Sequence, residues 1–294
     1  MGPIGRRQDV FQQSSDDMYT DDHQNPMRSW RLVIALVVGV CLGATARGQP
    51  PPPSAAALMN EVVANELTDR VQQRKWEYLI DRRAGKQILT EEQVDTKDGP
   101  LYRVLAIDGA PLNPGQRQED NARMDRILHD PIQQLKLKLE YDEDEAKLEK
   151  VLRLMPQAFV YDYDGVEGNL LRIKFWPNPN YNPPTYEARV VHSLAGTIFI
   201  DLQHKRLAKF SGRLMDRVEF GYGFLGYIDK GGTIEIGRVQ VDSSEWKTIF
   251  VNIQLSGRMV FFKTISKQEY ETRSNFRAVA GDLSLLAASQ LLSR

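Results

Sequence analysis

The second half of the chain alternates apolar and polar side chains over short runs, which is the pattern of antiparallel strands. In residues 247–255 the apolar positions two apart are Ile249, Val251, Ile253 and Leu255. A strand of this kind buries one face and leaves the other to solvent. Similar runs, separated mostly by glycine- or serine-containing turns, are 159–163, 170–176, 195–201, 207–217, 232–241 and 258–266.

Two turn signals set where neighbouring strands should end. Residues 164–169, which are rich in Asp and Gly, are expected to form the connection of a hairpin. Ser256-Gly257 is expected to be a turn that ends the 247–255 strand.

Helical periodicity opens the folded part of the chain. Ser54 is a favourable N-cap, and the apolar side chains after it recur at helical spacing at Leu58, Met59, Val62, Val63, Leu67 and Val71. Strand-like runs follow at 76–83, 86–96 and 101–107. Because the links between them are too short for parallel crossovers, we expect antiparallel neighbours.

Residues 115–155 return to helical spacing. The helical stretch is expected to kink or restart at Asp130-Pro131, because a proline disrupts the helix there, and to end at Pro156. Residues 282–294 form a short amphipathic helix that either packs on the sheet or offers a surface to a partner. The pattern predicts an α+β fold with one large twisted antiparallel sheet, covered on one side by helices.

Residues 27–48 have the composition of a secretory signal peptide. Two arginines precede an uncharged run at 32–46, and small residues allow cleavage after either Ala46 or Gly48. The run is shorter than the ~20 residues that span a bilayer, which favours cleavage. The alternative is an uncleaved segment 32–46 that anchors the chain in the inner membrane.

The remaining boundaries follow from composition. Residues 1–26 are polar, lack apolar periodicity and are expected to be disordered, with Met27 as the likelier start of translation. The proline-rich stretch 49–54 is a spacer, and 55–281 form a single domain before the C-terminal helix. We therefore expect a protein that works in the periplasm or is otherwise exported.

Composition narrows the classes of partner. Of 294 residues, 41% are hydrophobic and 26% charged, as in ordinary globular proteins. The 38 basic residues nearly balance the 39 acidic ones, so we expect no nucleic-acid partner. The single cysteine, Cys41, lies in the apolar run, so cleavage would leave no thiol chemistry.

Candidate catalytic and metal motifs each have a simpler explanation. Asp162 and Asp164 resemble the start of a calcium loop, but its closing glutamate is missing, which favours a turn. The four acids at 142–145 are expected to be a solvated helix end. His204 is expected on the surface of a turn, with only Asp201 nearby. With no H-E-x-x-H, G-x-S-x-G or P-loop motif, the chain predicts no metal, no cofactor and no recognisable enzyme.

The glycine-rich stretch 221–226 lacks the spacing of a phosphate-binding loop and is expected to link two strands. Its apolar residues Tyr222, Phe224 and Leu225, with Tyr227, either pack on the sheet or form a mobile, lipid-contacting edge.

Three segments are laid out as successive strands: 195–201 (A-G-T-I-F-I-D), 206–214 (R-L-A-K-F-S-G-R-L) and 258–265 (R-M-V-F-F-K-T-I). Over residues 75–277 the chain resembles the LolA/LolB-like superfamily of periplasmic lipoprotein-sorting proteins. The resemblance implies a half-barrel, in which a curved antiparallel sheet has helices on its concave face. It also implies a lipid or acyl-chain ligand between sheet and helices, and it transfers no site residue.

Three functional hypotheses follow. The first is a non-enzymatic periplasmic binding protein that holds a lipid or a lipoprotein acyl chain in an apolar cavity. The strand residues expected to face that ligand are Ile173, Phe175, Ile198, Ile200, Phe250 and Phe262. The second is an envelope protein–protein or sensing module with a filled core. The third is an envelope hydrolase, which a buried cluster of Asp, His and Ser would favour.

Overall fold

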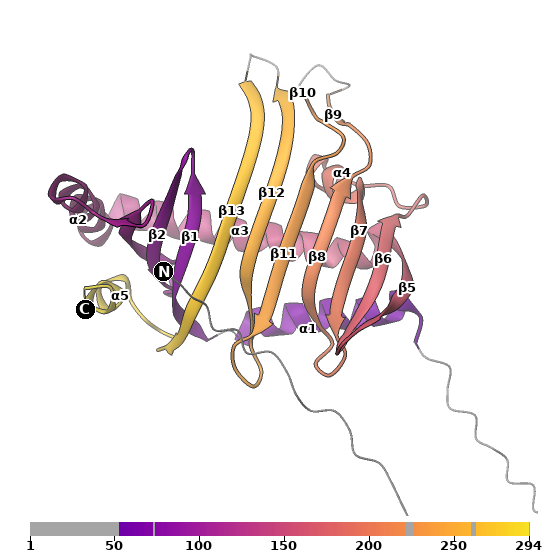
Figure 1. Ribbon diagram of the computed structural model, residues 1–294, viewed down its shortest axis with the longest axis horizontal. Helices are drawn as coiled ribbons and strands as arrows, with labels where there is room; N and C mark the ends of the chain where they lie inside the picture. The colour runs from indigo at the N-terminus through magenta and orange to yellow at the C-terminus, as the bar shows by residue number, and fades with distance from the viewer. Residues whose placement is uncertain (1–52, 73, 222–225, 260–262, 294) are drawn as a thin grey trace, which may run out of the picture. The chain divides into compact units, whose positions relative to one another are not determined.

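The computed structural model describes residues 53–293 apart from 73, 222–225 and 260–262 (Figure 1). The described residues form five helices and a 13-stranded antiparallel sheet. The helices are α1 (Ala55–Gln72), α2 (Pro114–His129), α3 (Pro131–Ala158), α4 (Tyr186–His192) and α5 (Leu285–Leu291). The strands are β1 (Lys75–Ala84), β2 (Gln87–Val94), β3 (Leu101–Ile107), β4 (Ala110–Pro111), β5 (Phe159–Glu167), β6 (Leu170–Pro177), β7 (Leu194–Asp201), β8 (Arg206–Leu214), β9 (Val218–Phe220), β10 (Gly226–Ile228), β11 (Thr233–Gln240), β12 (Trp246–Met259) and β13 (Lys263–Val279). The segments 1–26 and 27–48, and most of the spacer 49–54, lie outside the described residues.

The sheet brings strands from the beginning and the end of the chain side by side. Its strand order is β4-β3-β2-β1-β13-β12-β11-β8-β7-β6-β5, and β9 and β10 form a hairpin attached to β12. The last strand therefore lies beside the first, with Lys75 opposite Val279. The predicted fold class, α+β with a large curved antiparallel sheet, is confirmed (Figure 1).

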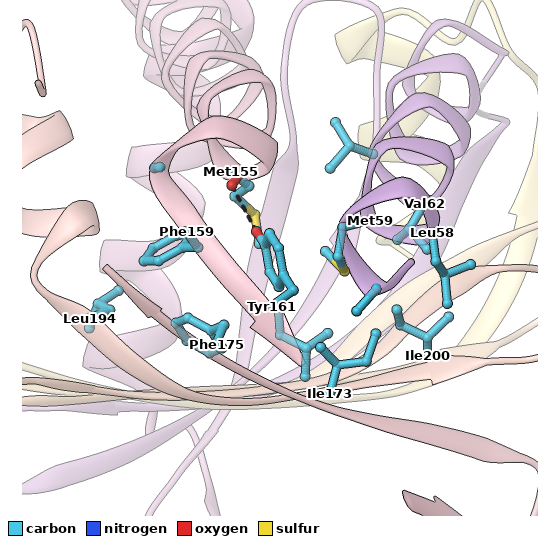
Figure 2. Close-up of a cluster of buried hydrophobic side chains, with 14 of the residues drawn as sticks. Leu58, Met59, Val62, Met155, Phe159, Tyr161, Ile173, Phe175, Leu194 and Ile200 are labelled. Atoms are coloured by element: carbon cyan, nitrogen blue, oxygen red, sulfur yellow. Dashed lines mark hydrogen bonds between the residues drawn. The ribbon is translucent and has the colours of Figure 1, made fainter. Parts of the chain in front are cut away.

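Helices α1 and α3 cover one face of the sheet and bury the main core (Figure 2). Met59 and Val62 of α1 and Met155 of α3 pack there against the apolar side chains of β5–β8. The hydroxyl of Tyr161 donates to the Met155 carbonyl at 2.7 Å, which satisfies the one polar group of this ring. A second cluster, in which Leu285 is buried, joins α5 and α2 to β2 and β3.

The helix boundaries follow the predicted signals. The Ala57 N–H donates to the Ser54 hydroxyl at 3.2 Å, as in an N-cap. Asp130 ends α2 and caps α3, where its carboxylate accepts from the Ile132 N–H at 2.8 Å. The prediction that the helix ends at Pro156 is wrong, because α3 continues to Ala158. A proline removes only one backbone donor, and this close to the helix end that loss is tolerated.

Ser256-Gly257 is not a turn. Strand β12 continues to Met259 and pairs with β13, so both strands are longer than predicted. A Cβ atom at position 257 would lie 2.2 Å from the Tyr227 carbonyl oxygen of β10. Glycine is therefore needed here because a neighbouring backbone approaches closely, a requirement that resembles a turn signal in the sequence.

Residues 164–169 contain the turn of the predicted hairpin between β5 and β6, but the turn is shorter than predicted. Strand β5 runs to Glu167, and the tight turn lies at Gly168, whose φ is +62°. Gly165, with φ +113°, lies at a β-bulge where the register with β6 shifts. Asp164 forms ion pairs there with basic side chains of β6, which explains an Asp-Gly pair inside a strand.

The connection after β6 contains a helix that the apolar pattern does not predict. Helix α4 has seven residues, and Thr185 caps it by accepting from the Ala188 N–H at 3.1 Å. A helix of two turns buries too few side chains to show a clear period in the sequence.

Candidate functional site

Four of the six residues expected to face a ligand fill the core instead of lining a cavity. Ile173, Phe175, Ile198 and Ile200 are at most 1% exposed and belong to the core under α1 and α3. Figure 2 shows Ile173, Phe175 and Ile200 on the helix-covered face of the sheet. The side chains of α1 and α3 pack directly on them. This half of the sheet therefore has a filled core.

Phe250 lies on the opposite face of the sheet, so the expectation that it faces inward is wrong. Successive residues of a strand point to opposite faces, and its neighbour Val251 faces the helices. The Phe250 ring instead meets Tyr270 at a centroid distance of 5.9 Å. Phe262 lies outside the described residues.

The predicted apolar loop is described only at its end. Tyr222, Phe224 and Leu225 lie outside the described residues. Tyr227 belongs to β10 and is half-buried, with the guanidinium of Arg217 4.1 Å from its ring centroid. A cation held on the face of this ring stabilises its packing on the sheet.

The cavity that could take a ligand lies elsewhere, between α1, α3 and the half of the sheet formed by β1, β2 and β11–β13. Its volume is about 440 Å³, within the range of ligand pockets. One wall is aliphatic and contains Leu148, Leu152, Leu207, Ile236 and Val251. Leu148 is 44% exposed, so this wall reaches the surface of α3.

The other end of the cavity is charged. Asp95 and Tyr78 meet there, with the Tyr78 hydroxyl 3.2 Å from the Asp95 carboxylate. Lys75, Lys247 and Arg273 come from three adjacent strands, β1, β12 and β13, and line the same end. The sequence reasoning missed all five residues.

Burial shifts the pKa values of Asp95, Lys247 and Tyr78 toward their neutral forms. Burial raises the pKa of Asp95, and the positive charges of Lys247 and Lys75 offset this only in part. Burial lowers the pKa of Lys247, against the opposing charges of Asp95 and Glu245. Burial also raises the pKa of Tyr78, which keeps its hydroxyl protonated as a donor. The charges at this end are therefore poorly solvated and incompletely compensated.

A buried ion network closes the other side of the cavity. The carboxylate of Glu66 on α1 accepts from Arg206 at 3.1 Å and pairs with Arg238 at 2.6 Å. Burial raises the pKa of Glu66, but the charge of Arg238 and the hydrogen bonds from Arg206 outweigh it and hold the pKa below its ordinary value. Arg206 also meets Asp69 at 2.5 Å. The network fixes α1 to β8 and β11.

His204 lies beside a second cleft, of about 450 Å³, and is only half-buried. Its Nδ1 is 2.8 Å from the buried carboxylate of Asp201, and Trp246 lies 6.1 Å from its ring. The expectation that only Asp201 lies nearby is therefore corrected. Ser243 and Ser244 line the same cleft, and within the described residues neither hydroxyl is hydrogen-bonded to His204.

The acids at 142–145 lie in the middle of α3 and not at a helix end. Asp142 pairs with Lys138, and Glu145 with Arg70 of α1. Among the described residues, no three His, Cys, Asp or Glu side chains are placed to hold a metal ion.

Comparison with known proteins finds no matching family model, curated protein or solved structure. Across the described part of the chain, no helix has the length and apolar character needed to cross a membrane.

Proposed function

We propose that this protein is an exported, non-enzymatic binding protein that holds the apolar part of a lipid or lipoprotein acyl chain in the 440 Å³ cavity. The observation that carries the proposal is the aliphatic wall formed by α3 and the strands β8, β11 and β12. Apolar surface of this kind, left accessible in a cavity, favours a ligand that water rejects. The resemblance to the LolA/LolB-like superfamily points to the same ligand class, and export is proposed from residues 27–48.

The test is to fill the cavity in the purified full chain. Val251→Trp places a large ring against the aliphatic wall. The control, Phe250→Trp, replaces a ring by a larger one on the opposite face of the same strand. Binding of dansyl-labelled undecanoic acid is followed by its fluorescence. We expect wild type and Phe250→Trp to bind the probe and Val251→Trp to lose it.

Probe binding that is unchanged in a folded Val251→Trp protein would refute the cavity as the ligand site. If Val251→Trp fails to fold, Leu148→Trp replaces it, because this side chain is 44% exposed and tolerates a larger group. Every variant retains residues 1–52, so differences between them report the cavity and not the apolar run.

A second candidate function is an envelope protein–protein module. The first turns of α3 expose Ile132, Leu135 and Leu139, at 74%, 59% and 58%. Three such side chains at helical spacing form an apolar stripe, which is typical of interaction surfaces. Under this function, Leu135→Glu would abolish association with the partner and leave probe binding unchanged.

A further inference from the structure

At the charged end of the cavity, basic side chains outnumber acidic ones. Lys75, Lys247 and Arg273 converge on it from three neighbouring strands, and Asp95 is the carboxylate between them. An amphiphile whose chain follows the aliphatic wall would place its head group near these residues. The partners that these side chains already have within the protein therefore indicate which kind of head group would bind.

Arg273 is satisfied within the protein, because it pairs with Glu271 on its own strand. Lys75 is not. Its ammonium lies 5.6 Å from the centroid of the Tyr141 ring, and among the described side chains no carboxylate lies within 4.0 Å of it. Lys75 therefore has a cation–π contact and, among the described side chains, no carboxylate at ion-pair distance, although the charge of Asp95 acts on it from farther away.

Lys247 is only weakly paired. Its nearest carboxylate, Glu245, is 3.7 Å away and already accepts from the Trp76 indole at 2.6 Å and from Arg74 at 3.0 Å. The Lys247 side chain is only 13% exposed, so its ammonium is largely removed from bulk water. The indole N–H of Trp246, which lines the same cavity, is also buried with no acceptor among the described residues.

We propose that Lys75 and Lys247 form a site for the carboxylate or phosphate head group of a single-chain amphiphile. The anion would supply both ammonium groups with an acceptor at hydrogen-bonding distance, through charge-assisted hydrogen bonds. The inference rests on the proposed function, since the chain of the same ligand lies along Leu152, Ile236 and Val251.

Proton uptake should accompany binding. An anion between the two lysines favours the charged form of Lys247 and the protonated form of Asp95, so affinity rises as pH falls. The other titratable or charged groups around this pair include Lys75, Tyr78, Tyr141, Glu145, Arg70, Glu245, Asp69 and Arg273. Burial lowers the pKa of Lys247 and raises the pKa of Asp95, so the bound anion acts on both groups in the direction of proton uptake.

The experiment compares head groups on one chain in the full-length protein. Dodecanoate, dodecyl phosphate and dodecanol are titrated by the quenching of tryptophan fluorescence, and binding is repeated by calorimetry in two buffers of different ionisation enthalpy. We expect either anion to bind about tenfold or more tightly than the alcohol, as one charge-assisted hydrogen bond provides. We also expect proton uptake with the anions alone.

Lys75→Met and Lys247→Met should each reduce the preference for the anion and leave dodecanol binding unchanged. Lys209→Met is the matched control, because its ammonium also lies over an aromatic ring, 5.3 Å from the centroid of Phe199, on the other face of the sheet. It should retain the full preference. Two substitutions keep the test decisive if Lys247→Met does not fold.

The outcomes separate the two proposals. Equal binding of dodecanoate and dodecanol by wild type, or an unchanged preference in folded Lys75→Met, overturns the head-group site and leaves the apolar cavity standing. Absence of binding by all three ligands overturns the proposed function. Inorganic phosphate that binds as tightly as dodecyl phosphate supports the anion site and overturns the amphiphile.

Discussion

Glu66 links α1 to the sheet and has four hydrogen-bonding or ionic contacts in a buried position. Its carboxylate accepts from Arg206 at 3.1 Å and from the Leu207 N–H at 3.0 Å, and it pairs with Arg238 at 2.6 Å. The side chain is 6% exposed. Glu66→Gln keeps the shape of the group but removes its charge and turns one acceptor oxygen into a donor that faces two guanidinium groups.

The loss in free energy of unfolding depends on which partners the two arginines keep in Glu66→Gln. Loss of one partner from a buried ion pair costs about 3–5 kcal/mol, because the other charge stays buried. Arg206 retains Asp69 at 2.5 Å, and Arg238 retains the Trp246 carbonyl at 3.0 Å. We therefore expect the lower end, about 3 kcal/mol, which lowers Tm by roughly 6–12 °C in a domain of this size.

Urea unfolding at neutral pH, followed by circular dichroism, measures the change. The control is Glu61→Gln on the same helix, where a single ion pair with Lys205 is nearly half exposed. Such a pair contributes at most about 1 kcal/mol. A loss in Glu66→Gln no larger than the loss in Glu61→Gln would show that the network does not hold α1 on the sheet.

The difference between wild type and Glu66→Gln should also depend on pH. The folded-state pKa of Glu66 lies below its ordinary value of 4.5. Its ionised form therefore stabilises the fold fully above pH 4.5, and this contribution is lost as pH falls through the folded pKa. The two unfolding curves should approach each other below pH 4.5, and a constant difference down to acid unfolding would contradict the assignment.

Two further predictions test packing by urea unfolding. Ile173→Ala, at a fully buried site, should lower the free energy of unfolding by about 2–5 kcal/mol. Leu286→Ala, on the exposed side of α5, should lower it by under about 0.5 kcal/mol. Similar losses in the two variants would refute the core assignment. Gly257→Ala places a Cβ 2.2 Å from the Tyr227 carbonyl and should cost about 1–3 kcal/mol. Gly281→Ala meets nothing within 4 Å and should be near neutral, so equal effects would mean that β10 does not lie close to β12.

Local signals predicted the elements well where one residue decides the backbone. Asp130-Pro131 marked the break between α2 and α3, since a proline restricts the residue before it and an aspartate caps the next helix. Gly257 and Gly165 misled, because a glycine that permits a close approach or a bulge has the same local signature as one in a turn. A glycine in the sequence indicates that a larger side chain is not tolerated there, but not whether a turn, a bulge or a neighbouring backbone is the reason.

The candidate site shows the same division. Alternation in 247–255 determined that this strand has one apolar face, and the structure turns Val251 toward α3 and Phe250 away. Which apolar positions form a cavity and which are covered depends on where α1 and α3 cross the sheet. Ile173 and Ile198 are buried under both helices, whereas Ile236 and Val251 border a space between them and the sheet.

By itself the sequence determined an α+β fold built on a large antiparallel sheet, because side-chain periodicity reflects a local geometry that each strand and helix carries alone. Only the tertiary structure decided that Lys75, Asp95 and Lys247 share one cavity. They come from β1, the end of β2 and β12, and these meet because the last strand, β13, inserts between β1 and β12. Pairing between strands so distant in sequence is fixed by the packing of the whole sheet and by no local pattern.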